Sequence, residues 1–267
     1  MTTKRLINIE PYTFARLPEL LSAYVSGTAS IGNYAFDECP KLETAEVGKE
    51  TDTLGLRPFS GCDNLKGVNF NDSPYFTETD GIIYALDENG AKKKIMQCLP
   101  GRGSVVGSRA VGPDELAGIA EIAPEAFMDC QAVRQVDLSS TTVANIPNLC
   151  FAESKNLNVV ILPNTIRAIR AGSFWNTEGL ASVTIPDSIG VIEPDAFALV
   201  DKNPDGTYGD PKKERPASMA FDFITLPGSV ADIYAEGYNY IGVKQDDSLK
   251  KVHEVTLIDG FDNTRYK

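Results

Sequence analysis

Phenylalanine recurs at a nearly fixed interval through most of this 267-residue chain. The recurring residues, spaced by 22, 23, 68, 24, 23 and 23 positions, are Phe14, Phe36, Phe59, Phe127, Phe151, Phe174 and Phe197. Self-similarity at a period of about 20–50 residues is typical of solenoid proteins, which stack one structural unit many times. Only the interval between Phe59 and Phe127 breaks the period, and it is long enough to contain an insertion.

Other columns of the repeat stay apolar together with the phenylalanines. An aliphatic residue stands five positions before each ring, as Ile31 and Ile169 do, and apolar residues follow at positions six, nine and eleven in the first six copies. The last of these columns alternate at period two, which indicates a short strand. Because such a strand cannot bury its inner face alone, we expect coil to stack on coil, with the phenylalanines forming an internal ladder.

The segment around the second phenylalanine carries a family resemblance. Residues 31–39 read IGNYAFDEC and match the end of the repeat L-x-x-V-x-I-P-x-x-V-x-x-I-G-x-x-A-F-x-x-C. Over about residues 6–240 the chain resembles the BspA-like leucine-rich repeat proteins. The resemblance implies a right-handed, mostly β solenoid with a short irregular, 3-10 or helical convex side and a hairpin insertion. It also implies a bacterial cell-surface or secreted, adhesin-type binding scaffold and no enzyme.

Two columns depart from the family pattern in the later copies. The glycine column, Gly32 and Gly55, continues as Ala123, Pro147, Arg170 and Glu193. The cysteine column, Cys39, Cys62 and Cys130, reads Leu17, Ser154, Thr177 and Val200 in the other copies. These changes leave the expected fold intact and weaken any functional claim that rests on one column.

The spacing also predicts the domain organisation. We expect a solenoid over residues 1–243, with insertions at about 72–118 and 201–218, a closing cap at 228–243, and a tail or edge strand at 244–267. Within the first insertion, residues 81–86 and 94–99 flank a turn and predict a hairpin. That hairpin either extends one coil or forms a binding protrusion. Residues 101–118 are expected to supply a degenerate coil.

Charge and hydropathy exclude several partners. The formal net charge is −12, which disfavours nucleic-acid backbones and anionic membranes. No stretch approaches the roughly 18 apolar residues that span a bilayer. The first residues, MTTKR, lead straight into a repeat without a signal peptide. Since the resemblance implies an extracellular or surface protein, we expect that an export signal was removed, with a cytoplasmic location as the alternative. We expect a monomer.

Five cysteines are an odd number for a secreted protein. Cys39 and Cys62 share a column in adjacent coils, so their backbones should lie about 5 Å apart. Stacked side chains point in parallel, which favours free buried thiols over a disulfide between these two residues. No C-x-x-C pair is present to support a structural zinc site.

The second insertion contains a possible calcium loop. Asp201, Asn203 and Asp205 place oxygen ligands at positions 1, 3 and 5, and a glycine occupies position 6. Position 12 is Lys212 where a bidentate glutamate belongs, and Asp210 could substitute for it. The alternative is a Pro-Asp-Gly surface turn. Calcium is the one cofactor that the sequence suggests.

Catalytic chemistry finds little support in the sequence. The one histidine, His253, lies in the atypical tail with no residue nearby to orient it. Paired acids such as Glu43 and Glu46 occupy strand positions that usually form a solvated face. We therefore expect no catalytic residues.

The residues between the apolar columns should face outward from the stacked strands. Tyr24, Val159, Ile161 and Phe223 are apolar or aromatic where contact with water is expected. We expect this open face to bind a protein or peptide, such as a host or matrix protein, unless an insertion or the tail covers it. Alternatives are a structural spacer or assembly module of a larger surface protein, and a carbohydrate-binding scaffold. The candidate ligand-binding residues are Tyr24, Glu46, Asn69, Asp137, Val159, Ile161, Thr184 and Phe223.

Overall fold

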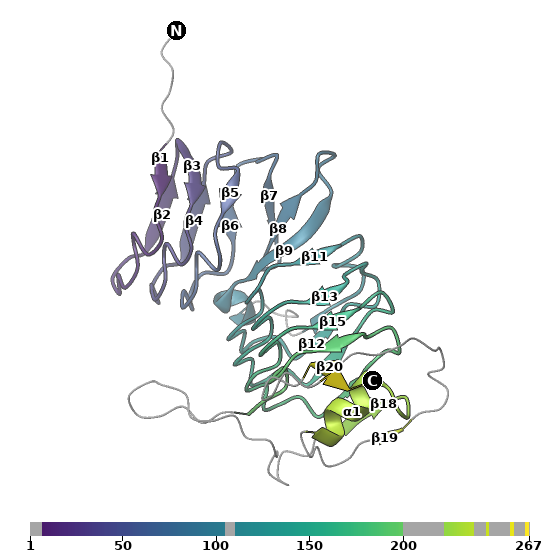
Figure 1. The fold of residues 1–267 in the computed structure, drawn as a ribbon. Helices are drawn as coiled ribbons and strands as arrows, with labels where there is room; N and C mark the ends of the chain where they lie inside the picture. Colours follow the sequence, from purple (N-terminus) through teal and green to yellow (C-terminus); the bar gives the residue numbers. More distant parts are fainter. Residues whose placement is uncertain are drawn as a thin grey trace. The chain divides into compact units, whose positions relative to one another are not determined.

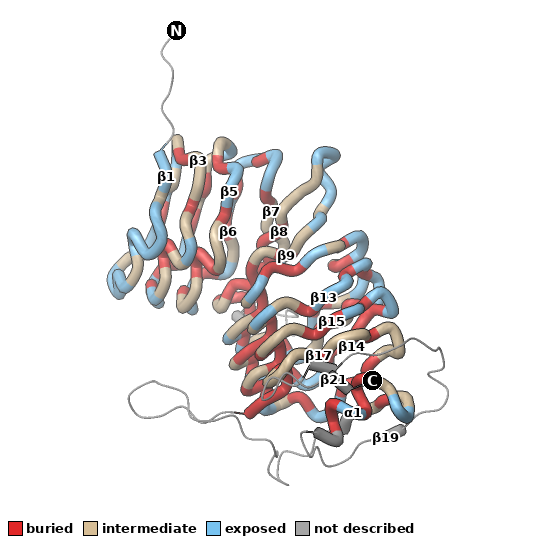
Figure 2. Tube along the Cα trace, in the orientation of Figure 1, coloured by how far each residue is buried: buried red, intermediate tan, exposed pale blue. Residues whose placement is uncertain are grey.

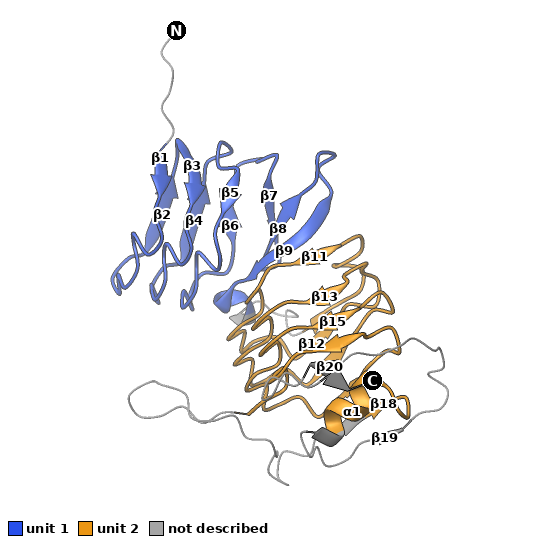
Figure 3. Ribbon diagram, in the orientation of Figure 1, with its two compact units in different colours: residues 1–109 blue, residues 110–267 orange. Residues whose placement is uncertain are grey.

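The computed structural model describes residues 7–104, 110–199 and 222–237, with three further short strands in the tail. The chain divides into two compact units, Met1–Arg109 and Ala110–Lys267 (Figure 3). Each unit is a β-solenoid of short strands stacked coil on coil (Figure 1). The solenoid fold expected from the repeat is confirmed.

Two parallel sheets form the coils of unit 1. The first sheet consists of β1 (Ile7–Ile9), β3 (Thr28–Ile31) and β5 (Thr53–Leu54). The second consists of β2 (Ser22–Val25), β4 (Thr44–Val47) and β6 (Val68–Asn69). The strands pair in repeat register, so that Ala23 aligns with Ala45 and Ala45 with Val68, and all three side chains are buried.

The first insertion is an antiparallel meander and not a hairpin alone. The expected hairpin is present as β8 (Ile82–Leu86) and β9 (Lys92–Cys98), and β7 (Phe76–Thr79) pairs with the other edge of β8. A 3-10 helix, η1 (Pro100–Ser104), follows. β7 was not predicted from the sequence because its residues, FTET, contain a single apolar side chain.

Unit 2 repeats the arrangement with more coils. Its longer sheet, in spatial order, contains β10 (Ala110–Val111), β12 (Gln135–Asp137), β14 (Val159–Ile161), β16 (Ser182–Thr184), β18 (Asp222–Thr225) and β19 (Lys244–Gln245). The other strands are β11 (Glu121–Ile122), β13 (Asn145–Ile146), β15 (Ala168–Ile169) and β17 (Val191–Ile192), with β20 (Leu257–Ile258) and β21 (Arg265–Tyr266) pairing in the tail. Val111 aligns with Val136, so the stretch expected to be a degenerate coil contributes β10.

The phenylalanine ladder exists in both units. In unit 1 the rings of Phe14, Phe36 and Phe59 stack with centroid separations of 5.2 and 5.4 Å. In unit 2 the four rings from Phe127 to Phe197 stack at 5.2, 5.2 and 4.7 Å. Figure 2 shows how buried positions recur from coil to coil, and every ring after Phe14 is at most 3% exposed. Each buried ring contributes a large apolar area to the core of its coil.

A pair of left-handed residues flanks each ring from Phe14 to Phe174, whereas at Phe197 only the preceding residue of the pair, Asp195, is left-handed. Positions two before and two after these six phenylalanines have positive φ, for example Tyr34 and Glu38 at 53° each in unit 1. Glycine fills such a position at Gly61 and Gly172, although left-handed backbone is uncommon for other residues. The resulting tight turn is stabilised between coils, because the Phe36 N–H donates to the carbonyl of the residue before the next ring at 2.8 Å.

The meander closes the last coil of unit 1 with two side chains. Phe59 has no following coil to supply a carbonyl, and its N–H donates to Oε1 of Gln97 on β9 at 3.3 Å. The Glu78 carboxylate on β7 accepts hydrogen bonds from the backbone N–H groups of Gly81 and Val68. Both side chains take positions that backbone groups of another coil would occupy, which protects the edge of the sheet.

A short helix covers the last ring of the unit 2 ladder. The Tyr234 ring of α1 (Val230–Gly237) packs edge-on against Phe197, with centroids 6.2 Å apart. Asp232 fixes the helix, because its carboxylate accepts bonds from the Gly228 N–H at 2.8 Å and from the Thr225 hydroxyl at 3.2 Å. Terminal coils of solenoids need such a cover over their apolar ends.

All five cysteines are free and buried, and for Cys39 and Cys62 this is what the parallel side-chain geometry predicts. The Cys62 thiol donates to the Phe36 carbonyl at 3.1 Å, and in unit 2 the Ser154 hydroxyl donates to the Phe127 carbonyl at 2.6 Å. At this position of the column a serine hydroxyl can therefore make the same hydrogen bond as a thiol. Burial raises the pKa of Cys62 to about 12.

Candidate functional site

The structure distributes the predicted binding residues over two separate strand faces. In unit 1, Tyr24 is 71% exposed on β2, Glu46 is half-buried on β4, and Asn69 is exposed on β6. In unit 2, Asp137, Val159, Ile161 and Thr184 lie on β12, β14 and β16. The predicted residues therefore form two candidate surfaces, one in each unit.

The face of unit 2 carries an apolar pair among polar neighbours. Val159 and Ile161 are 41% and 39% exposed on β14. The register places Gln135 beside Val159 and Asp137 beside Ile161, and exposed Ser182 lies beside Val159 on the opposite side. The pair thus forms a small aliphatic stripe with a polar border.

The prediction for β18 is wrong in register. Phe223 was expected on the outward face. Instead the backbone of Phe223 pairs with that of the buried Val183, and Thr225, two residues further on, is fully buried. The strand follows an insertion, so the repeat does not fix its frame, and a slip of one residue exchanges the two faces.

Two predicted residues have a structural role at the ends of their strands. Oδ1 of Asn69 accepts the N–H of Asn71 at 2.9 Å, and Oδ1 of Asp137 accepts the N–H of Ser139 at 2.9 Å. Such Asx turns end a strand by offering the backbone a local partner. These oxygens therefore contribute to the fold independently of any ligand.

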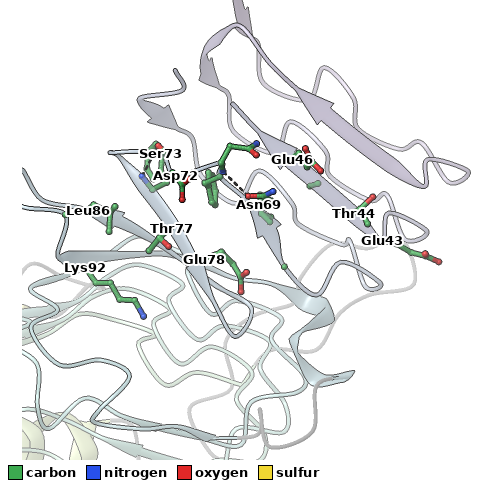
Figure 4. A pocket seen from close by; sticks show the side chains of 17 residues that line it. Glu43, Thr44, Glu46, Asn69, Asp72, Ser73, Thr77, Glu78, Leu86 and Lys92 are labelled. Atoms are coloured by element: carbon green, nitrogen blue, oxygen red, sulfur yellow. Dashed lines mark hydrogen bonds between the residues drawn. The ribbon is translucent and has the colours of Figure 1, made fainter. Parts of the chain in front are cut away.

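Unit 1 contains a groove that the repeat alone does not predict. It has a volume of about 850 Å³ and lies between the outward side of β4 and β6 and the meander (Figure 4). Val68, Phe70 and Phe76 form buried parts of its lining. The remaining lining residues are Glu43, Thr44, Ala45, Glu46, Gly67, Asn69, Asn71, Asp72, Ser73, Thr77, Glu78, Leu86, Gly90 and Lys92.

The charged side chains of this groove are mostly acidic. Glu43 and Glu46 come from the β4 side, Asp72 from the following bend, and Glu78 from β7 (Figure 4). Lys92 is the one cationic residue of the lining, and its ammonium lies 4.2 Å from the centroid of the Tyr84 ring. The groove therefore favours positively charged ligands.

Glu78 lies against the sheet because Gly67, the residue before β6, has no side chain. A Cβ added to Gly67 would lie 2.8 Å from Oε2 of Glu78. Burial raises the pKa of Glu78, and the hydrogen bond from the Gly81 N–H opposes that shift. Gly67 is the sequence signal that could have indicated this close approach.

The proposed calcium residues Asp201, Asn203, Asp205 and Asp210 lie outside the described residues. Among those that the structure describes, no three His, Cys, Asp or Glu side chains are placed to hold a metal ion. In the same part of the chain, no helix is both long enough and apolar enough to span a bilayer.

The stacked coils, the phenylalanine ladders and the open strand faces define a leucine-rich repeat solenoid. The chain belongs to the family described as BspA type leucine rich repeat region, because six copies of its model match residues 2–80 and 116–202. No curated protein matches the chain in sequence.

Two solved structures share this fold. A leucine rich cell surface protein of Faecalibacterium prausnitzii A2-165 is 16% identical over 90% of this chain and 64% of its own, with a TM-score of 0.58. The pneumococcal vaccine antigen PcpA is 16% identical over 90% of this chain and 70% of its own, with a TM-score of 0.55. The chain thus spans less than two thirds of the Faecalibacterium protein. At this identity both similarities concern the fold alone.

Proposed function

We propose that this protein is a non-enzymatic binding scaffold of the bacterial surface and that it holds a protein partner on the open strand face of unit 2. The observation that carries the proposal is the exposed pair Val159 and Ile161 on β14. Aliphatic side chains on an open, regular strand face provide area that a partner can bury. The polar strands on either side would form the rim of such an interface.

The surface location rests on the family and on the fold. BspA-type leucine-rich repeat proteins are surface-associated bacterial proteins, and the similar Faecalibacterium structure is described as a cell surface protein. Stacked repeats offer one or two outward side chains per coil, which suits extended protein contacts better than the enclosure of a reacting group. Contact with a host or matrix protein is the form of this function that we favour.

Surface plasmon resonance on purified extracellular-matrix proteins tests the proposal. The double variant Val159→Asp/Ile161→Asp should weaken binding at least tenfold, since it places two charges in the centre of the interface. A control for added charge is Asn145→Asp, which adds one charge at an exposed position on β13 of the same unit. Equal binding by the double variant and the wild type would contradict the proposal.

Two other outcomes separate the alternatives. Binding to a glycan array, with no binding to matrix proteins, would favour a carbohydrate scaffold that uses exposed aromatic residues such as Tyr24. Absence of binding in both assays would favour a spacer or assembly module of a larger surface protein.

A further inference from the structure

The groove of unit 1 is a second surface, distinct from the β14 face on which the proposed function rests. One wall consists of repeat strands β4 and β6, and the other consists of the inserted meander (Figure 4). An insertion that only closed the last coil would need Gln97 and Glu78 for its hydrogen bonds. The β8–β9 turn extends further and brings Leu86, Gly90 and Lys92 to the groove.

The charges of the groove favour a positively charged ligand. Four carboxylates, from Glu43, Glu46, Asp72 and Glu78, line it together with the single ammonium of Lys92. That ammonium is placed over the face of the Tyr84 ring. Because concave walls of low dielectric constant focus the field of their charges, the groove attracts cations and repels anions.

The spacing of the carboxylates favours an extended ligand over a compact ion. No three acidic groups in the described residues are close enough to share a metal ion. The four carboxylates of the groove therefore suit several separate cationic groups better than one compact ion. The volume of about 850 Å³ lies within the range of about 300–1,000 Å³ that holds organic ligands.

We infer that this groove binds an extended, basic segment of a partner protein. Successive side chains of an extended chain point to opposite sides, so one segment can direct arginine or lysine toward both walls. On one wall these side chains meet Glu43 and Glu46, and on the other they meet Glu78. Arginine fits best, because its guanidinium can bond a carboxylate with two parallel N–H groups.

Fluorescence anisotropy with the full chain tests this inference. The probe is a labelled peptide of repeating Arg-Arg-Ser-Ser, which places arginine on both sides of an extended chain, and the comparison is a labelled peptide of repeating Glu-Glu-Ser-Ser. The arginine peptide should bind, more weakly at higher salt, and the glutamate peptide should not. The double variant Glu43→Gln/Glu46→Gln should weaken binding at least tenfold.

A charge-matched control separates the groove from the net charge of −12. Glu10→Gln/Glu19→Gln removes two exposed carboxylates of unit 1 that do not line the groove, and it should change affinity less than twofold. Equal losses in the two double variants, or no binding of the arginine peptide, would overturn the inference.

Two further variants complete the test. Thr44→Trp adds bulk to an exposed lining position without changing charge, and it should also weaken binding of the arginine peptide. Val159→Asp/Ile161→Asp should leave that binding within twofold, because these residues belong to unit 2. The two variants therefore test peptide binding in the groove separately from partner binding on the β14 face.

Discussion

The two units build the same ladder of rings, but the first ring of unit 1 and the last ring of unit 2 are covered to different extents. Phe14, the first ring of unit 1, is 39% exposed, and it stacks on Phe36. Phe197, the last ring of unit 2, is fully buried, and Tyr234 of α1 packs against it. The stacking distances are alike in both ladders, so the repeat specifies the contact between coils. Completion of the core depends on residues outside the repeat.

The units also differ in the column four residues before each ring. The second and third coils of unit 1 have glycine there, and a Cβ added to Gly32 would lie 2.5 Å from the backbone N of Pro11 in the preceding coil. Unit 2 has Arg170 and Glu193 in the same column, and their side chains form an ion pair at 2.7 Å. At these positions the absence of a side chain lets the backbones of adjacent coils in unit 1 approach closely, whereas in unit 2 an ion pair connects adjacent coils.

The largest expected effect distinguishes an inner ring from an end ring. Phe174→Ala should lower the free energy of unfolding by about 3–5 kcal/mol, because it removes a fully buried ring and leaves a cavity. Phe14→Ala should cost less than about half as much, since one side of that ring already meets solvent. Urea unfolding of the full chain measures both. Equal losses would mean that Phe14 is covered in solution.

The next largest loss of stability is expected from substitutions in the glycine column. Gly32→Ala should destabilise unit 1 by about 1–3 kcal/mol, because the new methyl group meets backbone that cannot rotate away. In unit 2, Ala123→Gly at the equivalent position should cost only about 1 kcal/mol or less. Hydrogen exchange followed on peptides of each unit would localise both changes. Little effect of Gly32→Ala would show that the coils of unit 1 can separate at small cost.

The repeat was predictable because many columns agree at once. Apolar residues at fixed distances from each phenylalanine indicated the strands, the ladder and the parallel arrangement of the cysteines. The left-handed positions were not predictable, because residues such as Tyr34, Glu38 and Leu149 are not turn formers by composition. Neighbouring coils impose that conformation on them through the hydrogen bonds beside each ring.

Single-copy features were harder to predict than repeated ones. The register of β18 follows an insertion, so no column fixed the frame of Phe223. Gln97 and Glu78 act once each, at the end of unit 1, and resemble ordinary polar strand residues in the sequence. The groove depends on where the meander packs. Glu46 and Asn69 were predicted as outward residues, but the opposite wall was visible only in the structure.

The buried thiol column should make stability depend on alkaline pH. Burial raises the pKa of Cys62 from about 9 to about 12, so the unfolded chain ionises first as pH rises. The stability is fully present below pH 9 and is lost between pH 9 and 12, with about 1 kcal/mol lost by pH 10. Urea unfolding at several pH values measures this loss. Cys62→Ser should reduce it, because serine keeps the donor and does not ionise.

The exchange can be made in the opposite direction in unit 2. Ser154→Cys places a thiol at the equivalent buried position, beside the Phe127 carbonyl. We expect it to add alkaline sensitivity of similar size. If neither exchange changes the pH profile, the thiols do not control it, and ionisation elsewhere must account for any loss.

The smallest effect concerns the ion pair that replaces glycine in unit 2. Glu193 accepts bonds from both the Arg170 guanidinium and the Ala171 N–H, so Glu193→Gln should cost about 0.5–1 kcal/mol. The exposed pair of Lys41 and Glu19 in unit 1 is equally short at 2.7 Å, yet Glu19→Gln should cost about 0–0.5 kcal/mol. Urea unfolding in low and high salt separates the two. Because the backbone bond restrains Glu193, its pair should lose less in salt, and equal losses would show that solvent screens both pairs alike.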